Sequence, residues 1–487
     1  MNLKSITERY QPTIGIECHV QLKTKTKLFS GADNDARDKA PNTTVSPICF
    51  GFPGVLPVLN DEALTLAVRA GLALNAELPE ISRFERKHYF YPDLPKGYQI
   101  TQLAEPVIVG GYVDAPQLDG STRKVRIHHA HLEEDAGKLT HPVSGNESLV
   151  DLNRAGTPLI EIVSEADIHS PAEARAYVQE LYRLMTFAGV THGDLYHGNM
   201  RFDVNISLAP VGQAELGTRT EIKNLNSFRA VEKAAEFEAI RQAEVLDRGE
   251  KVVQETRGWN EDKQKTFSQR SKEDAHDYRY FPDPDIPPVR LDTKRVEAIK
   301  RDLPKLPGDY RASWANLGLD SSVINSLLAT QPIAAEVAAI QAEAGDVHAT
   351  KVANWFSSTV RPNDEESLAG MDMNFNRPGL IELANMVEAG DLSSTNAKKV
   401  FLAIVDTPSV SARHYASEHN LIQVSDVGAI IAIVETVLAD PSSQKAVEDI
   451  KAGNEKAIGY LVGQVMKQSH GQANPGLATK LINERIK

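Results

Sequence analysis

The segment DLNRAGTPLIEIVSE, residues 151–165, predicts a turn that leads directly into a buried strand. Asn153 and Gly156 favour the turn, because glycine tolerates positive φ and asparagine bonds readily to nearby backbone. The apolar run that follows is typical of a buried strand, and only Glu161 interrupts it. Since an unpaired carboxylate in apolar surroundings is costly, we expect a cation or strong hydrogen-bond donors to face Glu161. A structural ion pair, for instance with Arg154, would meet this need as well as a functional site would.

Segments 13–22 (TIGIECHVQL) and 200–208 (MRFDVNISL) alternate apolar and polar residues, which is the pattern of half-buried strands. Residues 219–223 repeat the pattern over a shorter length. Several such strands indicate a largely antiparallel sheet with one apolar face and one polar face. Six side chains could converge on the polar face: Glu17, His19, Asp203, Asn205, Glu221 and Lys223.

The residue types on this polar face suit a hard divalent cation. Carboxylate and amide oxygens with one imidazole favour Mg²⁺ or Mn²⁺ over zinc. The chain has no GxxxxGK[ST] or GxGxxG phosphate loop. ATP would therefore have to be held on a metal platform rather than by a P-loop.

A second ionisable run, VRIHHAHLEEDAGK at 125–138, begins as an alternating strand and ends in three adjacent carboxylates. Glu133, Glu134 and Asp135 repel one another unless they are exposed or bridged by a divalent cation. We expect exposure as the simpler solution, unless the strand faces further ligands.

Basic and aromatic residues are interleaved in RFERKHYFYPDLPKGYQI, residues 83–100. Arg86 and Lys87 in such surroundings suit a phosphate-bearing ligand whose base can stack on the rings. The alternative is a small aromatic core whose basic side chains reach out to solvent.

The composition is that of a soluble globular protein with more than one domain. The 487 residues are 41% hydrophobic and 24% charged, and they exceed the usual size of a single core. The only cysteines are Cys18 and Cys49, and no segment has the length and apolarity of a signal peptide or a membrane span, so we expect a cytoplasmic protein. Proline-rich residues 277–288 end the strand-rich part, and helical patterns follow.

The net charge of −13 argues against nonspecific nucleic-acid binding, because that binding needs clustered lysine and arginine. The last 43 or so residues are nevertheless locally basic. A basic patch for a specific partner and an ordinary solvated helix face both fit this pattern.

Six segments occur in the order found in the B subunits of the glutamyl-tRNA(Gln)/aspartyl-tRNA(Asn) amidotransferases, and the chain resembles this family over nearly its whole length. They are IGIECHVQLKT, RKHYFYPDLPKGYQI, HLEEDAGK, DLNRAGTPLIEIVSE, KNLNSF and DYRYFPDPD. The resemblance implies an α+β protein with three domains. These are a largely antiparallel β-sheet cradle with covering helices (1–292), an all-α helical domain (293–405) and a helical tail similar to the YqeY proteins that binds the tRNA body (406–487).

The resemblance also implies an activity and the residues that carry it. The family phosphorylates the side-chain carboxylate of misacylated Glu-tRNA(Gln) or Asp-tRNA(Asn) with ATP and Mg²⁺ and then forms the amide with ammonia. The implied catalytic residues are Glu17, Lys87, Glu134 and Glu161. The implied metal ligands are Glu17, His19, Glu134, Glu161 and Asp203. The implied nucleotide-binding residues are Arg86, Lys87, Asn153, Arg154, Asp203, Asn205 and Lys223.

The ammonia would come from a partner. The chain has no GGSSG-type amidase segment, and the resemblance implies a heterotrimer with an amidase-type glutaminase, the A subunit of the family, and a small C subunit. The rival interpretation is a scaffold that binds tRNA without chemistry. Some family members carry a four-cysteine zinc site in the loop after the first strand, but this loop offers only Ser30, Ser46 and Cys49, so we expect no structural zinc.

Overall fold

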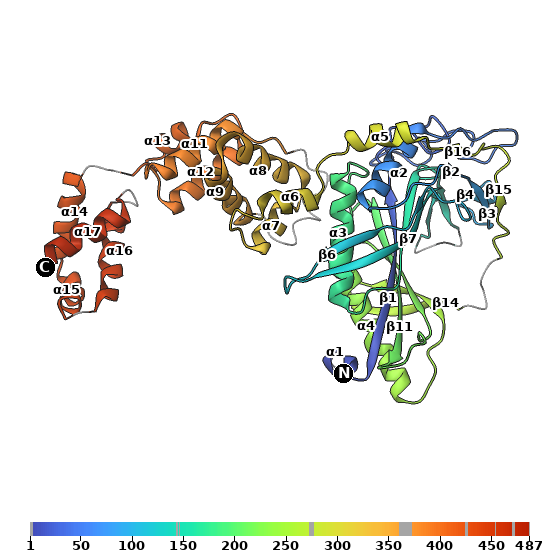
Figure 1. Ribbon diagram of the computed structural model, residues 1–487, viewed down its shortest axis with the longest axis horizontal. Coiled ribbons are helices and arrows are strands. Elements are labelled where there is room, and N and C mark those ends of the chain that lie inside the picture. Colours follow the sequence, from blue (N-terminus) through green and yellow to red (C-terminus); the bar gives the residue numbers. More distant parts are fainter. Residues whose placement is uncertain are drawn as a thin grey trace. The chain divides into compact units, whose positions relative to one another are not determined.

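The computed structural model describes residues 3–142, 145, 147–271, 277–359, 373–423, 427–452, 454–469 and 473–486. They form two compact units, one up to Ala312 and the other from Ser313 onward. The first unit combines a large sheet with helices, and the second contains helices in its described part (Figure 1). This content confirms the predicted α+β class.

A nine-stranded sheet organises the first unit. Its strands are β1 (Tyr10–Gln21), β5 (Ile108–Val109), β6 (Tyr112–Pro116), β7 (Thr122–Glu134), β10 (Pro158–Ser164), β11 (Met200–Pro210), β12 (Thr220–Leu225), β13 (Glu255–Asn260) and β14 (Lys265–Ser271). Their order is β14-β13-β12-β11-β1-β10-β7-β5, with β6 paired to β7. Among these described strands only β12 and β13 run parallel, so the sheet is largely antiparallel as expected.

The alternation in β1 is the one that the sequence predicts. Ile14, Ile16, Cys18 and Val20 are at most 1% exposed, whereas the intervening side chains are half-buried. Cys18 is thus one more small apolar side chain of the core. The opposite face of the strand is free to carry polar groups.

Two long helices cover the apolar face of the sheet. They are α3 (Pro171–Phe187) and α4 (Phe228–Asp247), and Figure 1 shows them side by side. Helix α3 begins where the sequence predicts, because Ser170 accepts a hydrogen bond from the Glu173 amide at 3.1 Å and proline follows the cap. The turn before β10 is also confirmed, with Gly156 at φ 83°.

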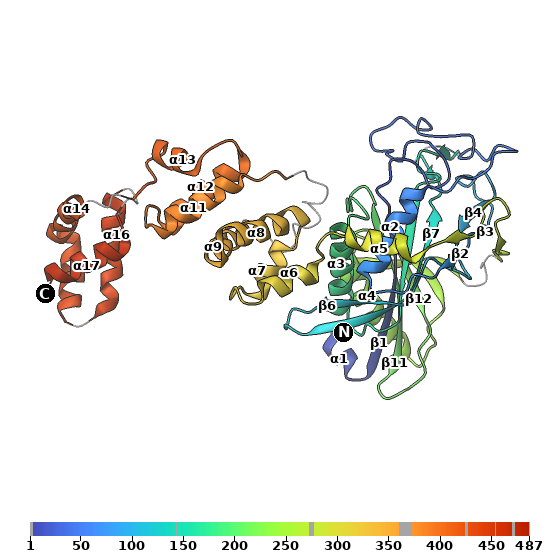
Figure 2. The same cartoon turned by 45° about the horizontal axis from the view of Figure 1, so that its top comes forward.

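Shorter helices and three small sheets complete this unit in its described part. Helix α2 (Asp61–Ala73) lies beside α5 (Thr293–Arg301) (Figure 2). An ion pair of 2.7 Å between Arg295 and Asp61 joins the two helices. The remaining elements are α1 (Leu3–Thr7) and the small sheets β2 (Ile81–Ser82) with β16 (Val289–Arg290), β3 (Glu85–His88) with β4 (Tyr98–Thr101) and β15 (Phe281–Pro282), and β8 (Lys138–Thr140) with β9 (Leu149–Asp151).

Helix α6 (Pro307–Trp314) spans the boundary between the units, and the described part of the second unit consists of further helices. They are α7 (Ser321–Leu327), α8 (Gln331–Ala344), α9 (Asp346–Ser357), α11 (Arg377–Glu388), α12 (Ser394–Asp406), α13 (Ala412–Glu418), α14 (Val427–Ala439), η2 (Pro441–Ser443), α15 (Gln444–Lys451), η3 (Glu455–Ala457), α16 (Ile458–Gln468) and α17 (Pro475–Ile486). No single helix in the described part of the chain is long and apolar enough to cross a membrane, although the bent pair α7 and α8 passes that test jointly by length and composition.

Candidate active site

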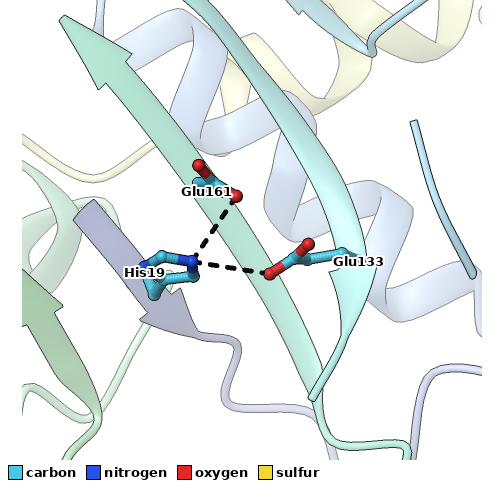
Figure 3. Close-up of side chains that lie close together, drawn as sticks. All are labelled: His19, Glu133 and Glu161. Atoms are coloured by element: carbon cyan, nitrogen blue, oxygen red, sulfur yellow. Dashed lines mark ion pairs between the residues drawn. The ribbon is translucent and has the colours of Figure 1, made fainter. Parts of the chain in front are cut away.

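Three neighbouring strands place a histidine and two glutamates together on the polar face of the sheet. His19 lies on β1, Glu161 on β10 and Glu133 on β7, and Figure 3 shows the three side chains pointing toward one another. His19 Nε2 is 3.4 Å from Glu161 Oε2 and 3.6 Å from Glu133 Oε1. We call this set, His19, Glu133 and Glu161, the histidine cluster.

The strand register explains how these residues meet. His19 is the direct partner of Glu161 across the β1–β10 pair, and Glu161 is the direct partner of His131 across the β10–β7 pair. His131 Nε2 is 3.3 Å from Glu161 Oε2 and 3.7 Å from Glu133 Oε2. The cation expected beside Glu161 is therefore an imidazolium on either side, and the alternative ion pair between Arg154 and Glu161 is wrong.

The histidine cluster is buried and strongly coupled. Burial by itself would lower the pKa of His19. The hydrogen bond and charge of Glu161 and the charge of Glu133 outweigh burial and raise the pKa from 6.5 to about 9. The same opposing effects raise the pKa of His131 to about 9. In turn, burial raises the pKa of Glu161 but the hydrogen bonds from His131 and His19 hold it well below its usual range. Without a metal the cluster consists of carboxylates and protonated imidazoles.

A second group of carboxylates lies further along the same face. Glu17, Asp203 and Glu221 offer oxygens that all lie within 4.8 Å of one another. Lys223 reaches two of these residues, with its Nζ 2.8 Å from Glu221 Oε1 and 3.3 Å from Asp203 Oδ2. We call Glu17, Asp203 and Glu221 the carboxylate cluster.

Asn205 completes the carboxylate cluster. Its Nδ2 donates to Glu17 Oε1 at 2.9 Å, while its Oδ1 is buried and has no hydrogen-bond partner in the described part of the chain. Burial and the nearby Glu161 charge raise the pKa of Glu17. Clustered carboxylates and an orphaned amide oxygen are ligands that a hard divalent cation would satisfy, so the residues present fit Mg²⁺.

The structure does not bring Glu134 together with either cluster. Glu134 pairs with Lys96 and accepts a hydrogen bond from the Ile100 amide at 3.0 Å, on the other face of β7 from Glu133. Its pocket also contains Lys27 and Cys49. Our expectation that Glu133 and Glu134 are exposed is wrong, because they are 3% and 4% exposed and each is compensated by buried partners.

Lys87 and Arg86 differ in their relation to the clusters. Lys87 lies near enough to the histidine cluster for Glu133 and Glu161 to raise its pKa, although burial opposes the rise. The Arg86 guanidinium is held instead by Asp283 and Asp285, each at 2.8 Å, and stacks on Tyr98 at 4.3 Å. The contacts of Arg86 match the alternative of an aromatic core with basic tips.

Asn153 and Arg154 lie beside the clusters and not in them. Asn153 Oδ1 accepts hydrogen bonds from the Thr43 and Thr44 amides at 2.7 and 2.9 Å, which fastens the long loop after β1. Arg154 donates to the Gly137 carbonyl at 2.8 Å, and its Nε is 3.3 Å from Asp135. Both residues line a polar cleft at the end of β1.

Sequence reasoning missed Glu133 and His131 as members of the histidine cluster. They are two residues apart, so the signal that could have found them is the period of two around the apolar Ala130 and Leu132. A β-bulge at His128, where consecutive residues of β10 pair with His129 and Ile127, obscures that period.

Comparison with known proteins identifies the family of the chain. The model of the GatB/GatE catalytic domain matches residues 12–297, and the model of the GatB domain matches residues 337–486. The B subunit of an aspartyl/glutamyl-tRNA(Asn/Gln) amidotransferase from Brevibacillus brevis is 44% identical over 481 residues, covering 98% of both chains. The protein of the same name from Persephonella marina is 44% identical over 98% of this chain and 100% of its own length. The chain therefore belongs to the family of the B subunits of the aspartyl/glutamyl-tRNA(Asn/Gln) amidotransferases.

Proposed function

We propose that this protein is the component that converts misacylated tRNA into its amide form, acting on Glu-tRNA(Gln), Asp-tRNA(Asn) or both. The observation that carries this proposal is the pair of acidic clusters on one face of the sheet, in a chain 44% identical to named B subunits over nearly its full length. The enzyme is a ligase that forms a carbon–nitrogen bond, with glutamine as the source of nitrogen.

The reaction needs an activated carboxylate. Ammonia does not displace oxide from a free carboxylate at a useful rate, so the side-chain carboxylate of the substrate first takes the γ-phosphoryl group of ATP. Ammonia then attacks the acyl phosphate, the carbon–oxygen bond to phosphate breaks, and inorganic phosphate and a proton leave. The site must therefore stabilise negative charge first on a phosphoryl group and then on a departing phosphate.

The clusters provide for that charge. The histidine cluster and the carboxylate cluster would hold Mg²⁺, which neutralises the transferring phosphoryl group when bound. Glu133 takes the place in this set that we expected for Glu134. Burial opposes the positive charge of Lys87, but Glu133 and Glu161 raise its pKa, so the side chain stays protonated. Lys87 would then stabilise the negative charge on the phosphoryl oxygens. Lys223 balances Asp203 and Glu221.

The protein needs a partner that releases ammonia from glutamine. The chain has no amidase segment of its own, so a glutaminase partner, the A subunit of the family, supplies ammonia, and a small C subunit completes the heterotrimer. We further propose that the helices after residue 292 hold the tRNA, with a division near residue 405, that the complex works in the cytoplasm, and that the loop around Cys49 carries no structural zinc.

A scaffold that only binds tRNA is the competing proposal, and amide formation separates the two. The assembled heterotrimer is given misacylated tRNA, ATP, Mg²⁺ and ammonium salt in place of glutamine, so that the glutaminase is bypassed. We expect amide-bearing tRNA that depends on both ATP and Mg²⁺. The absence of product with fully misacylated tRNA would favour the scaffold and reject the proposed function.

A further inference from the structure

Residues 277–285 (DYRYFPDPD) run alongside β3, and we call this segment the strap. Phe281 and Pro282 form β15, which pairs antiparallel with Arg86 and Glu85 of β3 (Figure 1). A ladder of two residues contributes little to stability by itself. Side-chain contacts must therefore keep the strap in place.

Arg86 makes the ion pairs that hold the strap. Its Nε donates to Asp283 and its Nη2 donates to Asp285, each at 2.8 Å. The Asp283 side chain is fully buried, and the Asp283 amide donates to the Phe84 carbonyl at 2.9 Å. The guanidinium also lies 4.3 Å from the centre of the Tyr98 ring. Because a planar guanidinium bonded to two carboxylates restricts both partners to one arrangement, Arg86 fixes the position of the strap on β3.

The other end of the strap lies against Lys87, which is also on β3. The His88 amide donates to the Tyr278 carbonyl at 2.8 Å, and Lys87 Nζ is 4.9 Å from the centre of the Tyr278 ring. The Tyr278 ring in turn meets the Tyr89 ring edge-on at 6.2 Å. Burial raises the pKa of Tyr280 and the charge of Lys87 lowers it, so the Tyr280 side chain is close to Lys87 as well. The strap thus forms an aromatic wall beside Lys87.

Lys87 depends on these surroundings for its direction. No hydrogen bond or ion pair of its Nζ is found among the residues that the structure describes. Burial opposes its charge, while Glu133 and Glu161 attract it. Since a lysine side chain has several rotatable bonds, the contact with the Tyr278 ring restricts the conformations open to it. Displacement of the strap would remove this restriction from the Lys87 ammonium.

We propose that Arg86 is a positioning residue for amide formation: it holds the strap so that the Tyr278 ring keeps the Lys87 ammonium directed at the histidine cluster. This inference rests on the proposed function and adds to it a residue that belongs to neither cluster. A displaced strap should also admit water, which hydrolyses the acyl phosphate to the free carboxylate and inorganic phosphate. ATP would then be consumed without amide formation.

Three variants of the assembled heterotrimer separate this role from a purely structural one. Arg86→Gln removes the ion pairs, Tyr278→Leu removes the ring beside Lys87 and keeps the ion pairs, and the double variant removes both. Arg83→Gln is the matched control, because Arg83 is exposed just before β3 and its ion pair with Glu105, at 3.2 Å, is exposed as well. Each protein is given misacylated tRNA, ATP, Mg²⁺ and ammonium salt, and the kcat, both KM values and the phosphate released per amide are measured.

We expect Arg86→Gln to lower kcat at least about tenfold, since misplacement of a reacting group by about 1 Å costs up to about a hundredfold. Both KM values should stay within about twofold of the wild type, because neither substrate loses a contact. The phosphate released per amide should rise. Tyr278→Leu should lower kcat a few-fold, and the double variant should be no slower than Arg86→Gln, because Arg86 acts through that ring. The control should match the wild type.

Other results overturn the inference. A higher KM for ATP with unchanged kcat would make Arg86 a nucleotide-binding residue, and a lower melting temperature with unchanged kcat would leave it a structural residue only. Losses that multiply in the double variant would show that Arg86 does not act through Tyr278.

Arg86→Gln leaves the buried Asp283 without its partner, so a second variant makes the same test if the first does not fold. Asp285→Ala loosens the strap but keeps the ion pair between Arg86 and Asp283, and the Asp285 side chain is 31% exposed. It should lower kcat at unchanged KM values, and a wild-type kcat would overturn the inference. In each of these cases the wild type still forms amide, whereas failure of the proposed function would appear as no product from the wild type.

Discussion

The coupling within the histidine cluster predicts how the stability of the metal-free protein depends on pH. His19 and His131 have pKa values of about 9 in the fold, against an ordinary value of 6.5. The stabilisation from each protonated imidazole is therefore fully present below pH 6.5 and is lost as the pH rises through about 9. A difference of about 2.5 pKa units corresponds to about 3 kcal/mol for each histidine. Because the two share Glu133 and Glu161, the total is smaller than the sum.

Glu161→Gln removes the carboxylate that touches both imidazoles. His19 then loses the hydrogen bond and charge that oppose burial most, so its pKa should fall, whereas His131 keeps its hydrogen bond to Glu133. This variant should therefore lack the part of the stability loss between pH 6.5 and 9 that comes from His19. The assay is the melting temperature of the first unit in EDTA at closely spaced pH values. At about 2 °C per kcal/mol for a domain of this size, the wild type should lose at least roughly 6 °C more than the variant over that window.

Glu165→Gln is the control, since Glu165 follows β10 and has no contact with the cluster among the described residues. It should keep the wild-type pH profile. Parallel profiles for wild type and Glu161→Gln would refute the assignment of charged imidazoles to this cluster.

Three further predictions concern metal binding and folding. The affinity for Mg²⁺ should rise with pH toward 9, by up to about tenfold per pH unit for each proton released, because the metal competes with the proton on His19. Isothermal titration calorimetry in buffers of different ionisation enthalpy measures the protons released on binding, and a value of zero would contradict this prediction. Glu133→Gln should weaken Mg²⁺ binding at least about tenfold and Glu134→Gln should leave it within about twofold, since only Glu133 belongs to a cluster; equal losses in equilibrium dialysis would count against the cluster. Arg311→Ala should lower the free energy of unfolding of the first unit by about 3 kcal/mol in denaturant, because the carboxylate of Glu180, which is 3% exposed, loses its hydrogen bonds from Arg311 at 2.6 and 2.7 Å. A change below about 1 kcal/mol would contradict this and show that Arg183 compensates the charge of Glu180.

The sequence predicts the framework of the first unit well because its signals are local. The period of two in residues 13–22 and 200–208 gives β1 and β11, and the Ser170–Pro171–Glu173 cap gives the start of α3. The need for a cation beside Glu161 also follows from the sequence, because it depends only on an apolar run around one carboxylate.

The identity of that cation depends on strand order and could not be predicted. His131 and Glu133 meet Glu161 only because β7 lies next to β10, and the bulge at His128 changes which residues of β7 face the core. Counted from Val125 and Ile127, the alternation would place Glu133 inside and Glu134 outside. The structure instead buries Glu134 against Lys96 and turns Glu133 toward His19.

The most direct test of the central claim is amide formation by the assembled heterotrimer with ammonium salt, misacylated tRNA, ATP and Mg²⁺, comparing wild type, Glu161→Gln and Glu165→Gln. If the histidine cluster is where the carboxylate is activated, Glu161→Gln should lose at least about a hundredfold in rate, equivalent to about 2.7 kcal/mol of transition-state stabilisation, while binding tRNA normally, and Glu165→Gln should match the wild type. A rate for Glu161→Gln within a few-fold of the wild type would contradict the claim and place the chemistry outside this cluster.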